Sequence, residues 1–173
     1  MASLAPGQLK SSFPAVADEA ARVLILGSLP GEASLRAAQY YAHPQNQFWR
    51  LMGVVIGREL QALPYPERLA ALRLAGVGLW DTVRSAERVG SLDAKIRGPT
   101  PNSLGAFAAT LPALRVIAFN GAKASAVGRG ELGPGSNFAL ITLPSSSPAH
   151  AVPFERKLEQ WIRLKTFLAG ASE

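Results

Sequence analysis

The chain of 173 residues predicts an α/β fold in which a parallel sheet is covered on both faces. Short, uninterrupted apolar runs alternate along it with segments of helical spacing, and strands buried on both faces have that character. Apolar residues make up 48% of the chain and charged residues 17%, which is the balance of a globular protein. The length suits a single domain over residues 1–173.

Four apolar runs are the expected strands. The first, residues 22–27, reads RVLILG and ends at a glycine, and the second, residues 77–80, is shorter and weaker. The other two, residues 114–119 and 138–143, read LRVIAF and FALITL. In open parallel sheets ligands bind beyond the carboxyl ends of the strands. The loops that follow these four runs are therefore where a site is expected.

The expected helices lie between and after these strands. They span residues 47–56, 66–74, 103–111 and 153–168, with a short alanine-rich helix after Gly121. Proline occupies the first turn of the second helix, and Asn102 is placed to cap the third. The last helix is amphipathic, with Phe154, Leu158 and Trp161 at helical spacing.

Composition excludes several kinds of site. The chain has no cysteine, so disulfides, thiolate nucleophiles, zinc–thiolate sites and cysteine-ligated iron–sulfur clusters are ruled out. His43 and His150 are its only imidazoles, so a histidine-rich metal site is not expected and we predict no metal.

Charge and hydropathy bear on the partner and the location. The formal net charge is +6 and the isoelectric point is about 10.2, a balance compatible with a polyanionic partner but shared by many proteins that bind no nucleic acid. The first twenty residues lack the apolar core of a signal peptide, and no apolar run is long enough to span a membrane. We expect a cytoplasmic protein, in a bacterial-type cytosol or nucleoid, with no membrane partner.

The first candidate loop is Gly27-Ser28-Leu29-Pro30-Gly31, directly after the first strand. Its glycines and proline let the backbone turn sharply and approach a ligand, and successive amides in such a turn can face an anion or a polar base edge. An ordinary strand-to-helix turn would explain the same residues. The loop is neither GxGxxG nor a P-loop, and Leu29 stands where a nucleophile elbow has its serine.

The second candidate segment, residues 39–49, reads QYYAHPQNQFW. Adjacent aromatic residues precede a polar loop, and Asn46 opens the helix that follows. Asn46 is explained equally well as a helix cap or as a pocket residue, and one amide can serve both roles. Tyr41 is either packed against the sheet or a platform on which a flat base stacks.

The third candidate segment, residues 143–150, reads LPSSSPAH and follows the fourth strand. Its serines, Ser145, Ser146 and Ser147, lie between prolines in a stiff loop whose hydroxyls and amides can bind phosphate oxygens. A solvated surface turn is the competing interpretation. A Ser–His hydrolase is not favoured, because no partner carboxylate is indicated.

Two polar side chains stand at the ends of other strands. Asp81 follows the second strand, where it could read a base, orient a water or cap a helix at residues 81–83. Asn120 follows the third strand and has the same ambiguity.

Together the three segments resemble the mismatch-specific and deoxyinosine DNA glycosylases of the uracil-DNA glycosylase superfamily. The shared pattern is a GxxPG loop, an HPxNxFW segment and a late Pro/Ser-rich loop. The form GSLPG, YYAHPQNQFW and LPSSSP looks most like the hypoxanthine branch, and the likeness runs from about residue 23 to residue 150. The second motif is the specific one.

The resemblance implies a three-layer α/β/α domain with a central four-stranded parallel sheet and no metal or organic cofactor. In the mismatch-specific relatives an asparagine at the third position of the first motif positions the attacking water, whereas this chain has Leu29 there. By analogy with the hypoxanthine branch, the essential amide is Asn46 and Tyr41 stacks on the flipped base. The loop from Ser145 to Pro148 would press on the DNA backbone.

The resulting prediction is a monofunctional, monomeric enzyme that hydrolytically excises hypoxanthine from DNA containing a deaminated base. Asn46 cannot be a general base, because a carboxamide does not titrate near neutrality; it positions the water or contacts the base, while the amides of residues 28–31 stabilise charge on the base. Pro148, Ala149 and His150 are candidates for the residue that enters the base stack, and His150 could instead contact a phosphate. The alternatives are a uracil or G·T/G·U mismatch glycosylase, a non-catalytic nucleic-acid-binding domain and a nucleotide enzyme.

Overall fold

The computed structural model describes residues 9–169 and contains the expected parallel sheet. Its strands are β2 (Val23–Gly27), β3 (Val77–Asp81), β6 (Val116–Asn120) and β7 (Ala139–Leu143), all parallel and in the order β3-β2-β6-β7. Every residue of β2 and β6 is buried, because both strands are interior and covered on both sides. The prediction of a four-stranded parallel sheet is confirmed.

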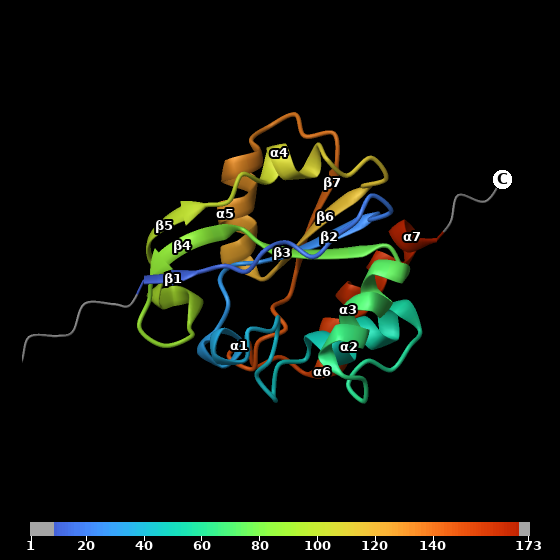
Figure 1. Ribbon diagram of the computed structural model, residues 1–173, viewed down its shortest axis with the longest axis horizontal. Coiled ribbons are helices and arrows are strands. Elements are labelled where there is room, and N and C mark those ends of the chain that lie inside the picture. Colours follow the sequence, from blue (N-terminus) through green and yellow to red (C-terminus); the bar gives the residue numbers. More distant parts are fainter. Residues whose placement is uncertain (1–8, 170–173) are drawn as a thin grey trace, which may run out of the picture.

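Helices cover both faces of this sheet (Figure 1). On one side lie α1 (Glu32–Ala37), α2 (Phe48–Ile56), α3 (Tyr65–Leu74) and α6 (Phe154–Trp161), and on the other α4 (Leu104–Ala108) and α5 (Ala122–Leu132). Alternate residues of β2 divide between the two cores: Ile25 packs with α2 and α3, whereas Leu26 packs with α4 and α5. The three-layer arrangement is therefore also confirmed.

The helix expected over residues 153–168 is interrupted. After α6 a 3₁₀ turn, η2 (Ile162–Leu164), leads into α7 (Lys165–Leu168). Trp161 and Leu164 are both fully buried in the core shared with α2. A 3₁₀ turn aligns residues three apart on one face, and Trp161 and Leu164 both lie in this core.

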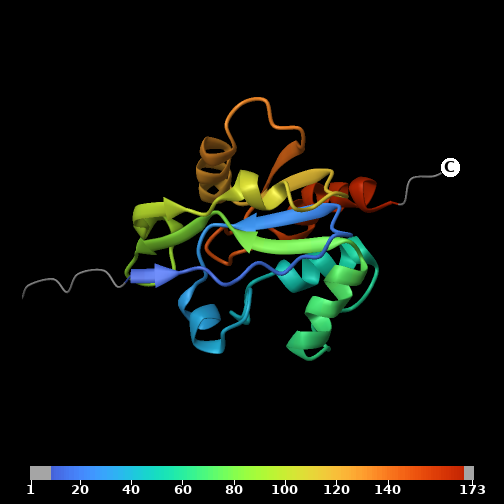
Figure 2. The ribbon, with the colours of Figure 1, turned by 45° about the horizontal axis from the view of Figure 1, so that its top comes forward.

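A second, antiparallel sheet was not predicted. It consists of β1 (Leu9–Ser11), β4 (Val83–Glu87) and β5 (Arg97–Pro101) in the order β1-β4-β5, with a 3₁₀ turn, η1 (Asp93–Lys95), before β5. Only Thr82 separates β3 from β4, so the chain runs from the carboxyl end of the parallel sheet directly into the small one (Figure 2). We call β1, β4, β5 and residues 88–96 the small-sheet region.

Two capping expectations are wrong. Ser103, not Asn102, precedes α4; the buried Asn102 amide instead donates to the Asp81 carbonyl (2.8 Å) and to Ser12 Oγ (3.1 Å). Asp81 caps no helix, because strand β4 follows it. The amide of Asn102 therefore joins the two sheets.

The prediction of one domain over residues 1–173 remains a prediction. It includes residues 1–8 and 170–173, which lie outside the described residues, and the expectation about the first twenty residues falls partly there too. Between residues 9 and 169 no helix is both long and apolar enough to cross a bilayer.

Candidate active site

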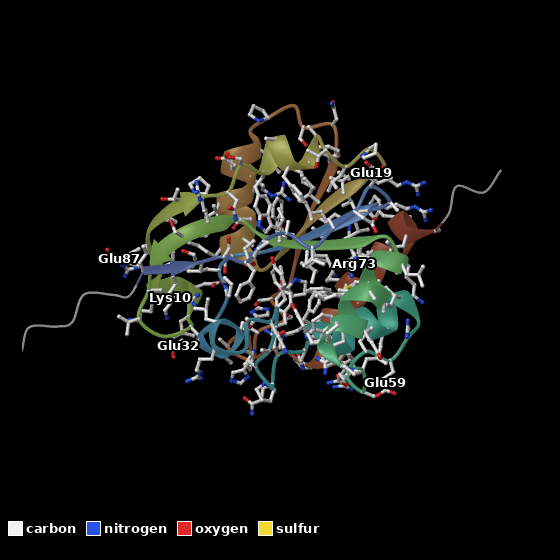
Figure 3. The ribbon with its side chains drawn as sticks, viewed as in Figure 1. Lys10, Glu19, Glu32, Glu59, Arg73 and Glu87 are labelled. Atoms are coloured by element: carbon white, nitrogen blue, oxygen red, sulfur yellow. The ribbon has the colours of Figure 1, made fainter. Side chains whose placement is uncertain are left out.

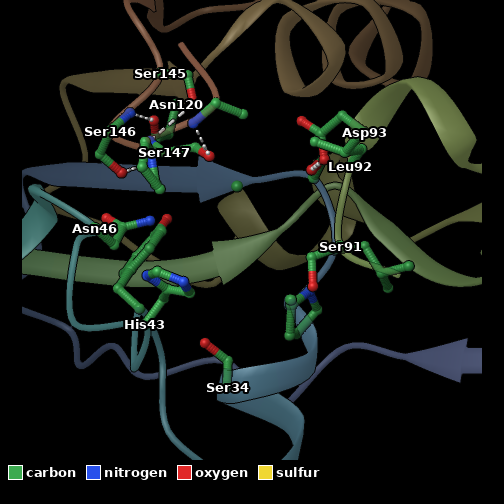
Figure 4. Close-up of a pocket in the computed structure, with 18 of the residues that line it drawn as sticks. Ser34, His43, Asn46, Ser91, Leu92, Asp93, Asn120, Ser145, Ser146 and Ser147 are labelled. Atoms are coloured by element: carbon green, nitrogen blue, oxygen red, sulfur yellow. Dashed lines mark hydrogen bonds between the residues drawn. The ribbon is translucent and has the colours of Figure 1, made fainter. Parts of the chain in front are cut away.

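A pocket of about 540 Å³ lies at the carboxyl edge of the parallel sheet, in the size range of small-molecule sites. Its walls come from the ends of the parallel strands, from the segment before α2, from the late Ser/Pro loop and from the small-sheet region (Figure 4). Every candidate site residue lines it, namely Gly27, Ser28, Leu29, Pro30, Gly31, Tyr41, Asn46, Asp81, Asn120, Ser145, Ser146, Ser147, Pro148 and His150. The structure thus brings the three motifs together.

The loop from Gly27 to Gly31 presents free backbone donors. Among the hydrogen bonds of the described residues, none uses the backbone N–H of Ser28, Leu29 or Gly31. The carbonyls of Gly27 and Ser28, by contrast, accept hydrogen bonds from Thr82 N and Val83 N at 2.7 and 3.0 Å. The loop is therefore fixed through its carbonyls while these amides stay available to a ligand.

The small-sheet region holds this loop from outside. Arg88, 1% exposed, donates to the carbonyls of Leu29 and Pro30 and, at 2.8 Å, to that of Gly90. The Leu29 side chain is buried with Val83, Ala86 and Ile96. Leu29 therefore anchors the loop to the small sheet, which is a packing role that suits its apolar side chain.

Two further contacts tie α1 to the same region. Lys10 of β1 pairs with Glu32 at 3.3 Å, and Figure 3 shows this pair at the end of the molecule opposite Glu59. Ser91 Oγ accepts the N–H of Glu32 at 2.9 Å. The first turn of α1, which follows the 27–31 loop, is thus fixed by one residue of β1 and one of the segment between β4 and β5.

Tyr41 combines both roles considered for it. One face of its ring stacks on Phe48, with centroids 4.0 Å apart and planes inclined by 19°. The residue lines the pocket, and its backbone is in the left-handed region at φ 55°, which few residues with a side chain adopt. Trp49 Nε1 donates to its carbonyl at 3.2 Å and helps hold this conformation. A ring supported by Phe48 is a rigid platform for a flat ligand.

Asn46 likewise serves the helix and the pocket. Its Oδ1 accepts the N–H of Phe48, the first residue of α2, at 2.9 Å. The N-cap position of this helix is Gln47. Figure 4 shows the amide nitrogen turned toward the pocket. Because Phe48 fixes the oxygen, the side chain presents Nδ2 as a hydrogen-bond donor in a defined direction.

Asp81 lies at the floor of the pocket and is 4% exposed. Its Oδ2 is buried and has no hydrogen-bond partner in the described part of the chain. Burial, and secondly the negative charge of Asp93, raise the pKa of this carboxyl to about 7, while Arg88 acts in the opposite direction. Buried titratable groups with perturbed pKa values in a pocket are typical of functional sites.

The side chain of Asn120 is hydrogen-bonded to the late Ser/Pro loop. Its Nδ2 donates to Ser146 Oγ and its Oδ1 accepts the N–H of Ser146, both at 2.9 Å (Figure 4). Gly121, at φ 100°, follows it, and a side chain there would lie 3.2 Å from Ser145 Cβ. The side chain of Asn120 therefore orients that loop, and any contact with a ligand would use its remaining donor or lone pair.

The Ser/Pro loop is held from several other directions. The carbonyl of Ser146 accepts the N–H of Gln47 at 3.0 Å, which links the second and third motifs. From α6, the buried Lys157 donates to the Ser147 carbonyl at 3.1 Å, and Trp161 donates to that of Pro144 at 2.9 Å. A loop rich in serine is in this way rigid at its base, while Pro148, Ala149 and His150 are exposed at its tip.

The sequence did not identify several residues of the pocket. His43, Ser91, Leu92, Asp93 and Ala94 also line it, and Asp93 accepts a 2.6 Å hydrogen bond from Ser28 Oγ. His43 lies within the second motif and could have been chosen from its place there. Residues 91–94 carry no local signal, because they reach the pocket only through the unpredicted small sheet.

Within residues 9–169 no group of three or more histidine and carboxylate side chains is arranged to hold a metal ion. The predictions that the protein uses no metal and no organic cofactor remain predictions. The chemistry that the pocket itself offers is that of hydrogen-bond donors, one buried carboxyl and an aromatic platform.

A parallel α/β sheet with such a pocket beyond its strand ends is the arrangement in which α/β proteins bind small ligands. Residues 13–167 match the family model described as the uracil DNA glycosylase superfamily. A match over nearly the whole chain shows that the protein belongs to this superfamily, as the three motifs suggest.

Individual relatives agree with this assignment. The chain is 41% identical over 156 residues to a Hypoxanthine DNA glycosylase of Methanosarcina acetivorans, covering 88% of this chain and 96% of that protein. It is 46% identical over 114 residues to a protein of the same name from Methanosarcina barkeri, covering 66% and 72%. A solution NMR structure from M. acetivorans, described as a candidate uracil DNA glycosylase, superposes with a TM-score of 0.83 at 39% identity, covering 93% of this chain and 99% of that one.

Proposed function

We propose that this protein is a monofunctional DNA glycosylase that excises hypoxanthine from DNA containing deoxyinosine. The observation that carries the proposal is the convergence of the three motifs on one pocket, with Tyr41 and Asn46 beside the free amides of the 27–31 loop. The names of the two Methanosarcina relatives support the choice of base.

The reaction requires the nucleotide to leave the duplex, because its glycosidic carbon is not accessible inside the stack. Extrusion of a nucleotide costs roughly a few kcal/mol, and the cost is lower for deoxyinosine because its base pair is weaker than a normal one. The flipped base would then stack on the face of Tyr41 opposite Phe48. Stacking between aromatic rings is sequence-tolerant, so the choice of base must come from polar groups around the ring edge.

In the chemical step, water attacks the anomeric carbon as the bond to the base nitrogen breaks, and the bonding electron pair leaves with the base. The proton that the water loses ends on the departing base, which leaves as neutral hypoxanthine. Asn46 Nδ2 donates to the departing base or holds the water, since its Oδ1 is already bound by Phe48 N–H. The amides of Ser28, Leu29 and Gly31 stabilise the developing negative charge as fixed dipoles. None of these groups needs to titrate.

The DNA backbone would lie across the pocket mouth. Ser145, Ser146 and Ser147 offer amides and hydroxyls to phosphates, although Asn120 already binds Ser146. The stack would be entered from one rim by Pro148, Ala149 or His150. Leu92, 51% exposed on the opposite rim, is a further candidate that the fold adds.

We further propose a cytoplasmic monomer that works without metal or organic cofactor. A net charge of +6 fits a DNA partner, because phosphate neutralisation supplies much of the affinity. Removal of uracil or of a mismatched base is the second candidate, favoured by the NMR structure described as a candidate uracil DNA glycosylase.

The test is excision from matched oligonucleotides that carry deoxyinosine, deoxyuridine, a G·T pair or no lesion, in single and double strands, with the abasic product cleaved by alkali. We expect the fastest cleavage with deoxyinosine, and without alkali no strand cleavage. Faster release of uracil would favour the second candidate. Binding of DNA without excision of any base would indicate a non-catalytic DNA-binding domain.

A further inference from the structure

Asp81 is fixed in place but its side chain is left without a partner. Its backbone carbonyl is bound by Asn102 Nδ2 at 2.8 Å, and its strand pairs residue for residue with β2, so that Asp81 lies opposite Gly27. The carboxyl oxygen Oδ2 is buried and has no hydrogen-bond partner within residues 9–169. A buried polar atom without a partner costs stability, so such an atom on a pocket floor indicates a group that a ligand completes.

The residue opposite has no side chain, and this leaves room for the carboxyl. A Cβ on Gly27 would lie 2.6 Å from Asp81 Oδ1 and 3.1 Å from the Tyr41 hydroxyl, which also has no partner among the described residues. Any side chain at position 27 would therefore force the Asp81 carboxyl to shift. The first motif thus opens a space into which the carboxyl and the phenol both project.

The surroundings of Asp81 favour its neutral form. The charged and titratable groups that face it are Asp93 of η1, Arg88 after β4, and the hydroxyls of Tyr40 and Tyr41. Burial contributes most, Asp93 adds to it, and Arg88 opposes both, leaving a pKa of about 7. Because the pKa is raised, the proton is held below about pH 7 and lost above it.

Building on the proposed function, we propose that Asp81 acts as a neutral carboxylic acid that reads the lactam edge created by deamination. Its O–H donates to the carbonyl oxygen of the flipped base, and its other oxygen accepts the adjacent ring N–H. The proton stays on Asp81. As the glycosidic bond breaks, negative charge spreads to that carbonyl, so the hydrogen bond strengthens in the transition state. A carboxylate would repel the same oxygen. Other enzymes also keep a buried aspartate protonated so that it can donate such a hydrogen bond.

The experiment is the pH dependence of single-turnover excision from duplex deoxyinosine, with enzyme in saturating excess. For the wild type, we expect the rate to fall about tenfold between pH 6 and pH 8, as a group with a pKa near 7 loses its proton. Asp81→Asn keeps a donor and an acceptor but cannot ionise. We expect it to be about fivefold slower at pH 6 and to lack this fall, while Asp81→Ala is slower by on the order of a hundredfold.

Glu59→Gln is the matched control, because Glu59 is exposed at the far end of the molecule and should keep the wild-type profile (Figure 3). The wild type and Asp81→Asn act on the same substrate, so ionisation of the base affects their rates equally. A ¹³C NMR titration of the Asp81 carboxyl in the wild type tests its protonation without any variant.

Three results would overturn the inference. The first is a wild-type rate that rises with pH while Asp81→Asn is inactive and folded, which would make Asp81 a base that activates water. The second is a wild-type rate with no fall above pH 7, and the third is a ¹³C shift that shows a carboxylate at pH 6. Absence of wild-type excision from every lesion at pH 6 would refute the proposed function instead.

Discussion

The two sheets meet at the pocket but contribute differently to it. The parallel sheet supplies the groups that face a ligand, since Gly27, Asp81 and Asn120 all stand at its strand ends. The small-sheet region supplies mainly support: Arg88 binds the carbonyls of the 27–31 loop, and Asp93 binds Ser28. Only the half of the pocket built on the parallel sheet follows from general rules for α/β folds.

The groups that face the ligand and the residues that hold those groups in place therefore come from different parts of the chain. The amides of the 27–31 loop are useful only if they are held in one orientation, because fixed dipoles stabilise charge without reorganisation. Their orientation depends on an arginine that lies about sixty residues later and never touches the ligand space directly. Variants on the two sides should therefore fail in different ways.

The largest effect is expected in the segment before α2, which together with the parallel strand ends supplies the groups that face a ligand. Asn46→Ala should slow hypoxanthine excision by on the order of a hundredfold or more, since a positioned donor is worth about 3 kcal/mol. The variant also loses the hydrogen bond to Phe48 N–H, so Asn46→Asp, which keeps that acceptor but removes the Nδ2 donor, accompanies it. Single-turnover rates and gel-shift affinities give the comparison.

We expect both variants to be slow while DNA affinity stays within a few fold of wild type. A normal rate in Asn46→Asp would exclude Nδ2 from the reaction. A slow Asn46→Ala beside a normal Asn46→Asp would mean that the side chain matters only as a cap of α2.

The next effect tests the small-sheet side. Arg88→Met keeps much of the apolar length of the side chain but leaves the carbonyls of Leu29 and Pro30 without their donor, whereas the Gly90 carbonyl keeps its hydrogen bond from Lys10 Nζ. We expect the free energy of unfolding to drop by about 3 kcal/mol and excision to slow about tenfold. Chemical denaturation and single-turnover rates measure the two effects.

Arg84→Met is the matched control, on strand β4 just before Arg88. The Arg84 side chain is exposed, so stability should change by less than about 0.5 kcal/mol. A folded Arg88→Met protein with a wild-type rate would show that the 27–31 loop keeps its shape without the arginine, and the proposed division of labour would fail.

The same division explains what the sequence could predict. The parallel strands were identified because each is an apolar run such as VLILG, which burial on both faces requires. The strands β4 and β5 read VRSAE and RGPTP; β5 is exposed at every position and contains two prolines, so neither shows an apolar pattern. Residues 91–94 were therefore missed together with the sheet that carries them.

Within the site, the sequence located residues but not their hydrogen bonds. Asn46 and Asn120 look alike as asparagines at element ends, yet Asn46 keeps Nδ2 free while Asn120 binds Ser146 through both ends of its amide. Asn46 finds its partner two residues along the chain, whereas Asn120 finds its partner through tertiary contacts between segments 26 residues apart. Local patterns contain no information about them.

The smallest effect concerns the two rims of the pocket. Leu92 is 51% exposed on the small-sheet rim, facing the tip of the Ser/Pro loop across the pocket mouth. An apolar side chain there can fill the space that an extruded base leaves, which matters only when the lesion is in a stacked duplex. Leu92→Ala should therefore lower excision from double-stranded DNA about fivefold more than from single strands, a difference of about 1 kcal/mol.

Leu74→Ala provides the control, because Leu74 is 86% exposed at the end of α3 and does not line the pocket. It should affect both substrates equally. If Leu92→Ala lowers excision from both substrates to the same degree, Leu92 supports the loop around Asp93 and does not open the duplex. In that case the small-sheet region only positions the 27–31 loop, and base-stack entry belongs to Pro148, Ala149 or His150 on the other rim.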